Sequence, residues 1–193
     1  MAHLIDDAYF FELKYTNWYI LLIHTIMNTL PKVLSSQTRV RFQDADPYKH
    51  LNNSKYIDYL INAREDQVEE AYGLNFVEIA QQRNLGWVVA QQQIAYLKPA
   101  YVWETVYIDS QLTQLSNRHL EAEIRMWDKD KKQLKAFLWV RFVAVGVKEQ
   151  RVKEHPEDLM DLLGQVLLPL DEPTFEARHA FWRQENKKAK ALV

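Results

Sequence analysis

The chain has 193 residues, of which 48% are apolar, a formal net charge of −2 and no cysteine. This size and composition fit one domain with a buried core and short extensions. The charge argues against a nucleic-acid partner, because such proteins carry a basic surplus. The lack of cysteine excludes disulfides, zinc–thiolate sites and cysteine nucleophiles. It is compatible with a reducing cytoplasm, which is the expected location.

Residues 1–37 are expected to form an N-terminal helical extension. The apolar run Trp18–Leu30 is too short to span a bilayer, so no transmembrane segment is expected. We interpret it as a helix that Pro31 ends and that docks on the domain or on a partner subunit. Weak contact of residues 8–30 with a membrane surface is the alternative.

The middle of the chain combines one long helix with several strands. Apolar residues at helical spacing predict an amphipathic helix that opens at Ser54 and ends at Gly73. Period-two or continuous apolar patterns predict strands over 38–42, 87–97, 106–112, 119–126 and 134–147. This order favours an α+β domain, placed at residues 38–165, in which an antiparallel sheet wraps around the central helix.

The end of the chain, residues 166–193, reads as a C-terminal helical extension. A short amphipathic helix over His155–Leu163 precedes it, and Phe175–Lys190 predicts a last helix with a basic tip. We interpret that tip as a solvated helix end rather than a binding patch.

Chemistry concentrates in residues 41–56, at the junction between the first strand and the long helix. Pro47 favours an extended Asp46, while Asn52 and Asn53 are helix-capping types. A helix that starts here presents unpaired N–H groups that can hold an acyl carbonyl oxygen or a phosphate. Asp46 precedes those donors, where a general base or nucleophile is useful.

The residues Asp46, His50, Asn52, Asn53 and Tyr56 resemble the Asp-x-x-x-His-Val-Asn-Asn-x-x-Tyr signature of hot-dog-fold thioesterases. These are the 4-hydroxybenzoyl-CoA thioesterase and acyl-ACP thioesterase group. Residues 97–100 are similar to the Leu-x-Pro-Ala that follows the second strand in that group, and the resemblance covers about the middle two-thirds of the chain. Many of these relatives have glycine where this chain has Lys49.

The resemblance implies a hot-dog fold and the hydrolysis of an acyl-CoA or acyl-ACP to free acid and thiol. It implies no metal and no redox cofactor, with coenzyme A entering only as part of the substrate. It also implies a homodimer, or a dimer of dimers, with active sites at the subunit interface.

The expected catalytic residues are Asp46 as base or nucleophile, His50, and Asn53 through its backbone N–H. The expected substrate-binding residues are Asn52, Tyr48, Tyr56 and Lys98, and Lys49 and Arg118 are further candidates for coenzyme A phosphates. Each of these residues also has a purely structural interpretation. Asp46 would then be a turn residue, His50 a packed histidine, and Asn52 and Asn53 helix caps. Glu65 or Asp66 could supply the carboxylate instead of Asp46.

Three other protein classes compete with the thioesterase interpretation. A haloacid-dehalogenase-type phosphatase wants Thr or Val at position 48 and a parallel βαβ pattern, and the chain has neither. A hot-dog enoyl-thioester hydratase has its Asp and His five positions apart, whereas Asp46 and His50 are four apart. A hot-dog protein that binds acyl thioesters or assembles without turnover is the remaining alternative.

Overall fold

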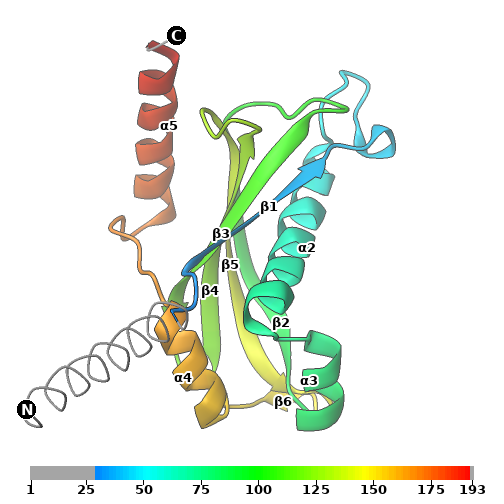
Figure 1. The fold of residues 1–193 in the computed structure, drawn as a ribbon, viewed down its shortest axis with the longest axis vertical. Coiled ribbons are helices and arrows are strands. Elements are labelled where there is room, and N and C mark those ends of the chain that lie inside the picture. The colour runs from blue at the N-terminus through cyan, green and yellow to red at the C-terminus, as the bar shows by residue number, and fades with distance from the viewer. Residues whose placement is uncertain (1–28, 192–193) are drawn as a thin grey trace, which may run out of the picture. The chain divides into compact units, whose positions relative to one another are not determined.

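A computed structural model describes residues 29–191 as a six-stranded antiparallel sheet with four α-helices (Figure 1). The strands are β1 (Val33–Arg39), β2 (Gly86–Tyr96), β3 (Thr105–Leu115), β4 (His119–Asp128), β5 (Leu134–Gly146) and β6 (Arg151–Val152). The helices are α2 (Asn53–Tyr72), α3 (Phe76–Arg83), α4 (Glu157–Val166) and α5 (Phe175–Ala191). The sheet order is β1-β3-β4-β5-β2, with β6 on β5. The expected α+β class and hot-dog arrangement, a sheet wrapped around one long helix, are confirmed.

Helix α2 begins at Asn53, one residue before the predicted start at Ser54, and Gly73 ends it as predicted. The side chain of Asn52 caps it by accepting a hydrogen bond from the Ser54 N–H at 3.0 Å. Gly73 ends it in the left-handed conformation, with φ of +67°, which glycine adopts without steric cost. Its buried residues, among them Tyr56 and Leu60, pack against the apolar layer of the sheet.

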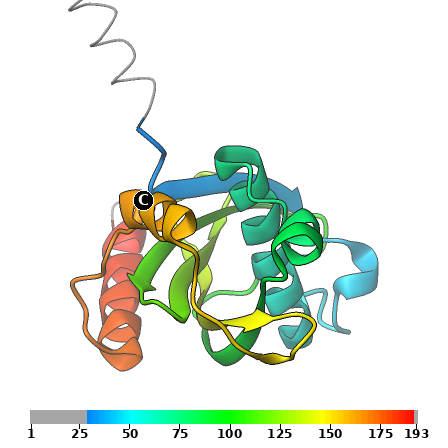
Figure 2. The same cartoon turned by 90° about the horizontal axis from the view of Figure 1, so that it is seen from below.

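The strands direct alternate residues to opposite faces of the sheet. On β4, Ala122, Ile124 and Met126 join the core around α2. Glu123 and Arg125 point the other way, where Glu123 contacts α5. Helices α2 and α5 therefore lie on opposite faces of the sheet (Figure 2).

The first strand differs from its expected bounds of 38–42. It runs from Val33 to Arg39 and pairs with β3, and Phe42–Asp44 form a 3-10 turn instead. Only Leu34 of this strand is buried, so its mostly polar sequence lacks the apolar pattern by which a strand is predicted. Helix α3 and strand β6 have no counterpart among the sequence predictions. Helix α4 corresponds to the helix predicted over His155–Leu163 and begins two residues later, at Glu157.

The N-terminal predictions fall almost entirely before Thr29. Residues 18–28 of the expected helix and residues 8–28 of the expected membrane-surface segment thus lie outside the described residues. Thr29 and Leu30 are described and are not helical. Among residues 29–191, no helix has both the length and the apolar character needed to cross a membrane. The division of the chain at residues 37 and 165 stays a prediction.

Candidate active site

The loop before α2 is organised by the side chain of Asp46. Its Oδ1 accepts hydrogen bonds from the backbone N–H of Tyr48 at 2.8 Å and of His50 at 2.9 Å. The Asp46 N–H donates to the His50 carbonyl at 2.7 Å. Within residues 29–191 no protein group bonds Oδ2 of Asp46. One carboxylate oxygen therefore holds the loop, and the other has no protein partner among residues 29–191.

The same loop is tied to the segment that follows β2. The Leu51 N–H donates to the Ala100 carbonyl at 2.8 Å, and the Ala100 N–H donates to the Tyr56 hydroxyl at 2.9 Å. The Val102 N–H donates to the Lys49 carbonyl at 2.9 Å. Lys49 has φ of +64°, a conformation that disfavours residues with a Cβ. This cross-linking fixes Asp46 beside the start of α2.

The first turn of α2 leaves one backbone donor free. The side-chain Oδ1 of Asn52 accepts hydrogen bonds from the N–H and the hydroxyl of Ser54. The main-chain carbonyl of Asn52 accepts from the Lys55 N–H. Among the described residues the Asn53 N–H has no acceptor, while the Asn53 carbonyl accepts from the Tyr96 hydroxyl at 3.1 Å. A free N–H at a helix N-terminus suits a partial negative charge.

These groups meet in an open hollow of about 310 Å³, which we call the site hollow. It is lined by Asp46, His50, Leu51, Asn53, Tyr56, Tyr96, Leu97, Lys98 and Pro99. Five of the seven residues expected from the sequence thus come together. The other two do not line the hollow: Asn52 serves as the helix cap, and Tyr48 is 79% exposed.

His50 and two tyrosines complete the walls. The His50 ring contacts Tyr101 edge-on at 5.1 Å between centroids, and within the described chain neither ring nitrogen is hydrogen-bonded. Burial raises the pKa of Tyr56, against the opposing effect of its hydrogen bond from Ala100, and burial also raises the pKa of Tyr96. Both hydroxyls are therefore protonated at neutral pH. Sequence reasoning missed Tyr96, although it stands directly before the motif at residues 97–100.

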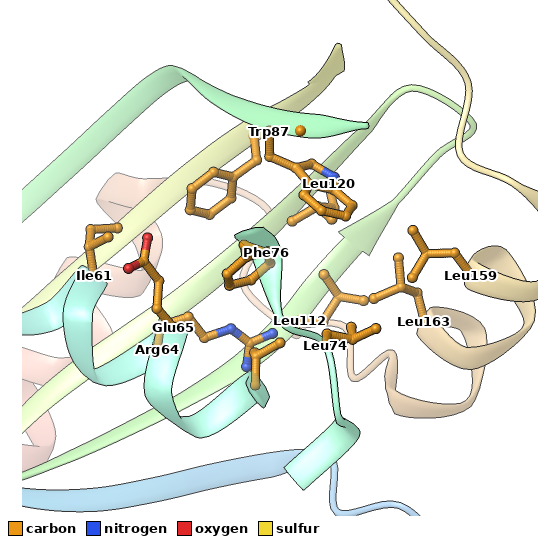
Figure 3. Close-up of a pocket in the computed structure, with 13 residues that line it drawn as sticks. Ile61, Arg64, Glu65, Leu74, Phe76, Trp87, Leu112, Leu120, Leu159 and Leu163 are labelled. Carbon is orange, nitrogen blue, oxygen red and sulfur yellow. The ribbon is translucent and has the colours of Figure 1, made fainter. Parts of the chain in front are cut away.

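A second, mostly apolar cavity of about 160 Å³ lies further along α2 (Figure 3). Its lining includes Ile61, Arg64, Glu65, Val68, Phe76, Trp87, Leu120 and Leu163. Burial lowers the pKa of Arg64 to about 10, so the guanidinium remains charged at neutral pH. Its hydrogen bond within the described residues goes to the Ser110 hydroxyl at 3.0 Å.

Three of the remaining charged candidates, Glu65, Asp66 and Arg118, do not line the site hollow. Glu65 lines the apolar cavity rather than the site hollow, and Asp66 lines neither. Burial, followed by the nearby charge of Asp66, raises the pKa of Glu65. Arg118 forms an ion pair with Glu154 at 2.8 Å, outside the site hollow. Of these three carboxylates, only Asp46 lines the site hollow together with Asn53.

A sheet wrapped around one helix, with a carboxylate before the start of that helix, defines a hot-dog protein of the thioesterase class. Residues 40–163 match the family model of the Thioesterase-like superfamily, and the chain belongs to that family. The expectation of a thioester hydrolase is confirmed at this level.

Individual relatives agree with the family. The chain is 27% identical over 134 residues to the long-chain acyl-CoA thioesterase FadM of Escherichia coli K12, covering 69% of this chain and 99% of that protein. It is similar to the crystal structure of the probable thioesterase YbaW from Escherichia coli, with a TM-score of 0.60, 26% identity and coverage of 70% and 99%. The 12:0-ACP thioesterase of Umbellularia californica shares the fold, with a TM-score of 0.63, 13% identity and coverage of 72% and 52%.

Proposed function

We propose that this protein hydrolyses acyl-CoA thioesters to the free acid and coenzyme A in the site hollow. The observation that carries the proposal is that Oδ2 of Asp46 and the N–H of Asn53 line one hollow and that neither has a hydrogen-bond partner among residues 29–191. The similarity to a relative named as a long-chain acyl-CoA thioesterase supports the choice of substrate.

In the proposed reaction the thioester carbonyl oxygen accepts a hydrogen bond from the Asn53 N–H as negative charge develops on it. In other enzymes one such donor is worth about 2.7–4 kcal/mol of transition-state stabilisation. Asp46 either takes a proton from an attacking water or attacks the carbonyl carbon itself, forming an anhydride that water then hydrolyses. Either route breaks the carbon–sulfur bond. The leaving sulfur receives a proton from Asp46 in the first route, and from solvent in the second, so that coenzyme A is released as the thiol. Neither route needs a metal or a redox cofactor.

The experiment is thiol release from a panel of short, long and aromatic acyl-CoAs by the wild type and by Asp46→Asn. Asparagine keeps an Oδ1 that can accept from Tyr48 and His50, so the loop is expected to survive while the charge on Oδ2 is lost. We expect turnover to fall roughly 10²–10⁴-fold.

Asp58→Asn is the matched control. Asp58 is an exposed residue of α2 that pairs with Lys55 at 3.0 Å and does not line the site hollow, so turnover should stay at the wild-type level. A wild type that is inert across the panel, or an Asp46→Asn variant as active as Asp58→Asn, would contradict the proposal.

The acyl group is proposed to run along α2 from the site hollow toward the apolar cavity. Residues Asn53 and Ile61 lie on the same helix, about 12 Å apart along its axis at 1.5 Å per residue. Val68→Phe would fill much of the cavity. We expect it to reduce turnover of long acyl-CoAs and to spare short ones, with thermal unfolding checking the fold. An equal loss for all chain lengths would place the acyl group elsewhere.

The expected homodimer, or dimer of dimers, also belongs to this proposal. In the described part of the chain β2 pairs only with β5, so its other edge is unpaired, and Val88 and Val89 are about half exposed. Exposed edges of this kind are usually covered. We expect a second copy to cover it, and light scattering of the wild type and of Val89→Lys tests this.

We also propose a cytoplasmic location for the protein.

A further inference from the structure

A second recess adjoins the site hollow, between the end of β2 and helix α5. We call it the basic groove, and it has a volume of about 490 Å³, within the range of small-molecule sites. It shares Tyr96, Leu97 and Lys98 with the site hollow. A ligand in the groove can therefore continue into the site hollow without leaving the protein surface.

Four cations line the basic groove: Lys98 from the end of β2, and Arg183, Lys187 and Lys190 from α5. Within residues 29–191 none of the four forms an ion pair with a carboxylate. The neighbouring Lys188 lies outside the groove and pairs with Glu185 at 2.6 Å. In a chain with a net charge of −2, this concentration of unneutralised positive charge indicates an anionic ligand.

The helix dipole does not account for this arrangement. Cations near the C-terminus of α5 are favourable for that reason alone, which covers Lys187 and Lys190. The dipole effect is confined to the last turn, whereas Arg183 lies about two turns before the end and Lys98 belongs to another element. Two elements thus converge on one recess with the same charge.

The wall of the groove is held in place by side-chain hydrogen bonds. The Asn186 Oδ1 accepts from the Leu134 N–H at 2.9 Å, and its Nδ2 donates to the Leu134 carbonyl at 2.9 Å. About two turns before it, the Arg178 guanidinium donates to the buried carboxylate of Glu123 at 2.7 and 2.9 Å. The cations are therefore presented on a fixed surface, which lowers the cost of binding.

We infer that the basic groove binds the phosphate groups at the nucleotide end of coenzyme A while the thioester lies in the site hollow. Guanidinium and ammonium groups bind phosphates well. Coenzyme A carries a diphosphate and a ribose phosphate, whereas an acyl carrier protein presents the same pantetheine arm on a single phosphodiester. The groove would thus select acyl-CoA, and α5, which lies beyond the family match at residues 40–163, would supply this selection. The inference rests on the proposed function only for the position of the thioester.

Two measurements test phosphate binding in the basic groove separately from hydrolysis in the site hollow. Calorimetry with coenzyme A, 3′-dephospho-coenzyme A and pantetheine measures binding without turnover. Steady-state kinetics with acyl-CoA and with the matching acyl-pantetheine, which lacks the nucleotide, measures its contribution to hydrolysis. The variant is Arg183→Gln combined with Lys187→Gln, and Lys188→Gln is the control, because it removes a charge from the same helix outside the groove.

We expect coenzyme A to bind at least tenfold more tightly than pantetheine, with the 3′-dephospho form between them. The double variant should raise KM for acyl-CoA at least tenfold, leave its kcat within twofold, and leave both constants for acyl-pantetheine unchanged. Lys188→Gln should match the wild type. Because Arg183 and Lys187 are exposed, thermal unfolding should be unaffected.

Four results would overturn the inference. They are equal affinity for coenzyme A and pantetheine, an equal loss on acyl-pantetheine, an equal effect of Lys188→Gln, or a KM effect seen with an acyl carrier protein substrate and not with acyl-CoA. A protein that hydrolyses no thioester but binds coenzyme A through these residues would refute the proposed function and leave the groove standing. A protein that hydrolyses acyl-CoA with unchanged KM in the double variant would do the reverse.

Discussion

The two faces of the sheet are stabilised by different physics. The face that holds α2 is an apolar layer in which Ile108, Ile124 and Leu138 are fully buried. The opposite face, under α5, buries a network of charges: Glu123 has no exposed surface and accepts hydrogen bonds from Arg125, Arg178 and the Trp139 indole. Apolar contact tolerates small shifts, whereas buried charges need their partners in place. Helix α2 is thus held mainly by the burial of apolar surface, whereas α5 is held by buried charged groups that must keep their positions.

The largest expected effect comes from the charged face. Glu123→Ala leaves Arg125 and Arg178 without their shared carboxylate, and breaking a buried pair in this way costs about 3–5 kcal/mol. Urea unfolding measures the loss. The control is Glu121→Ala on the same strand and face, whose partner Arg141 is partly exposed and can turn to solvent, so the loss should be clearly smaller. Equal losses would show that the network adds nothing beyond ordinary packing.

The next residue of the strand tests the apolar face. Ile124→Ala removes a fully buried side chain from the layer around α2 and should cost about 2–5 kcal/mol in urea unfolding. Ile124→Val, which keeps most of the volume, should cost only about 0.5–1.5 kcal/mol. A loss that does not scale with the volume removed would mean that this face, too, depends on a specific arrangement.

A smaller effect is expected from pH, at the rim of the apolar face. His155 accepts from the Trp87 indole N–H at 3.0 Å, and its other ring nitrogen lies 3.0 Å from the Ser116 carbonyl, so the neutral ring fits both. Burial is the main cause that lowers the pKa of His155, opposed by the Ser116 carbonyl and reinforced by His119. The unfolded chain therefore binds the proton more readily, and stability should fall as pH drops below about 6.5.

Unfolding midpoints at several pH values between neutral and acidic conditions check this. The loss should begin near the pKa of an unfolded histidine and be complete once the pH has passed below the folded value. His155→Gln, which can keep both hydrogen bonds without titrating, should show a shallower decline. If both proteins decline in parallel, other groups set the acid sensitivity.

The apolar face was predictable from the sequence, and the charged face was not. Alternation in residues 119–126 predicts which side chains of β4 share a face, because that depends only on strand geometry. That Glu123 is buried depends on Arg178, 55 residues away, and on the docking of α5. Helix α3 was missed because Gln81, Gln82 and Arg83 give its sequence no clear apolar period.

The site follows the same division. Asp46, His50 and Asn53 were predictable together because they belong to one local stretch, and Lys98 because it falls in a second recognisable motif. The basic groove was not, because the cations of α5 read as a solvated helix end until the end of β2 is placed against them. Local chemistry is visible in a sequence, while surfaces made by distant segments are not.

The smallest expected effect lies in the site loop, at Lys49. Lys49 stands where many resembling proteins have glycine and has φ of +64°, a conformation that costs a residue with a Cβ about 1–2 kcal/mol. Lys49→Gly relieves this strain but adds about 0.5–1 kcal/mol of backbone entropy to the unfolded chain. We expect a net gain of up to about 1.5 kcal/mol in urea unfolding, with thiol release retained. Lys49→Ala separates backbone from charge, because alanine keeps the strain. A gain shared by both variants would mean that the lysine charge, and not its conformation, is the cost at this position.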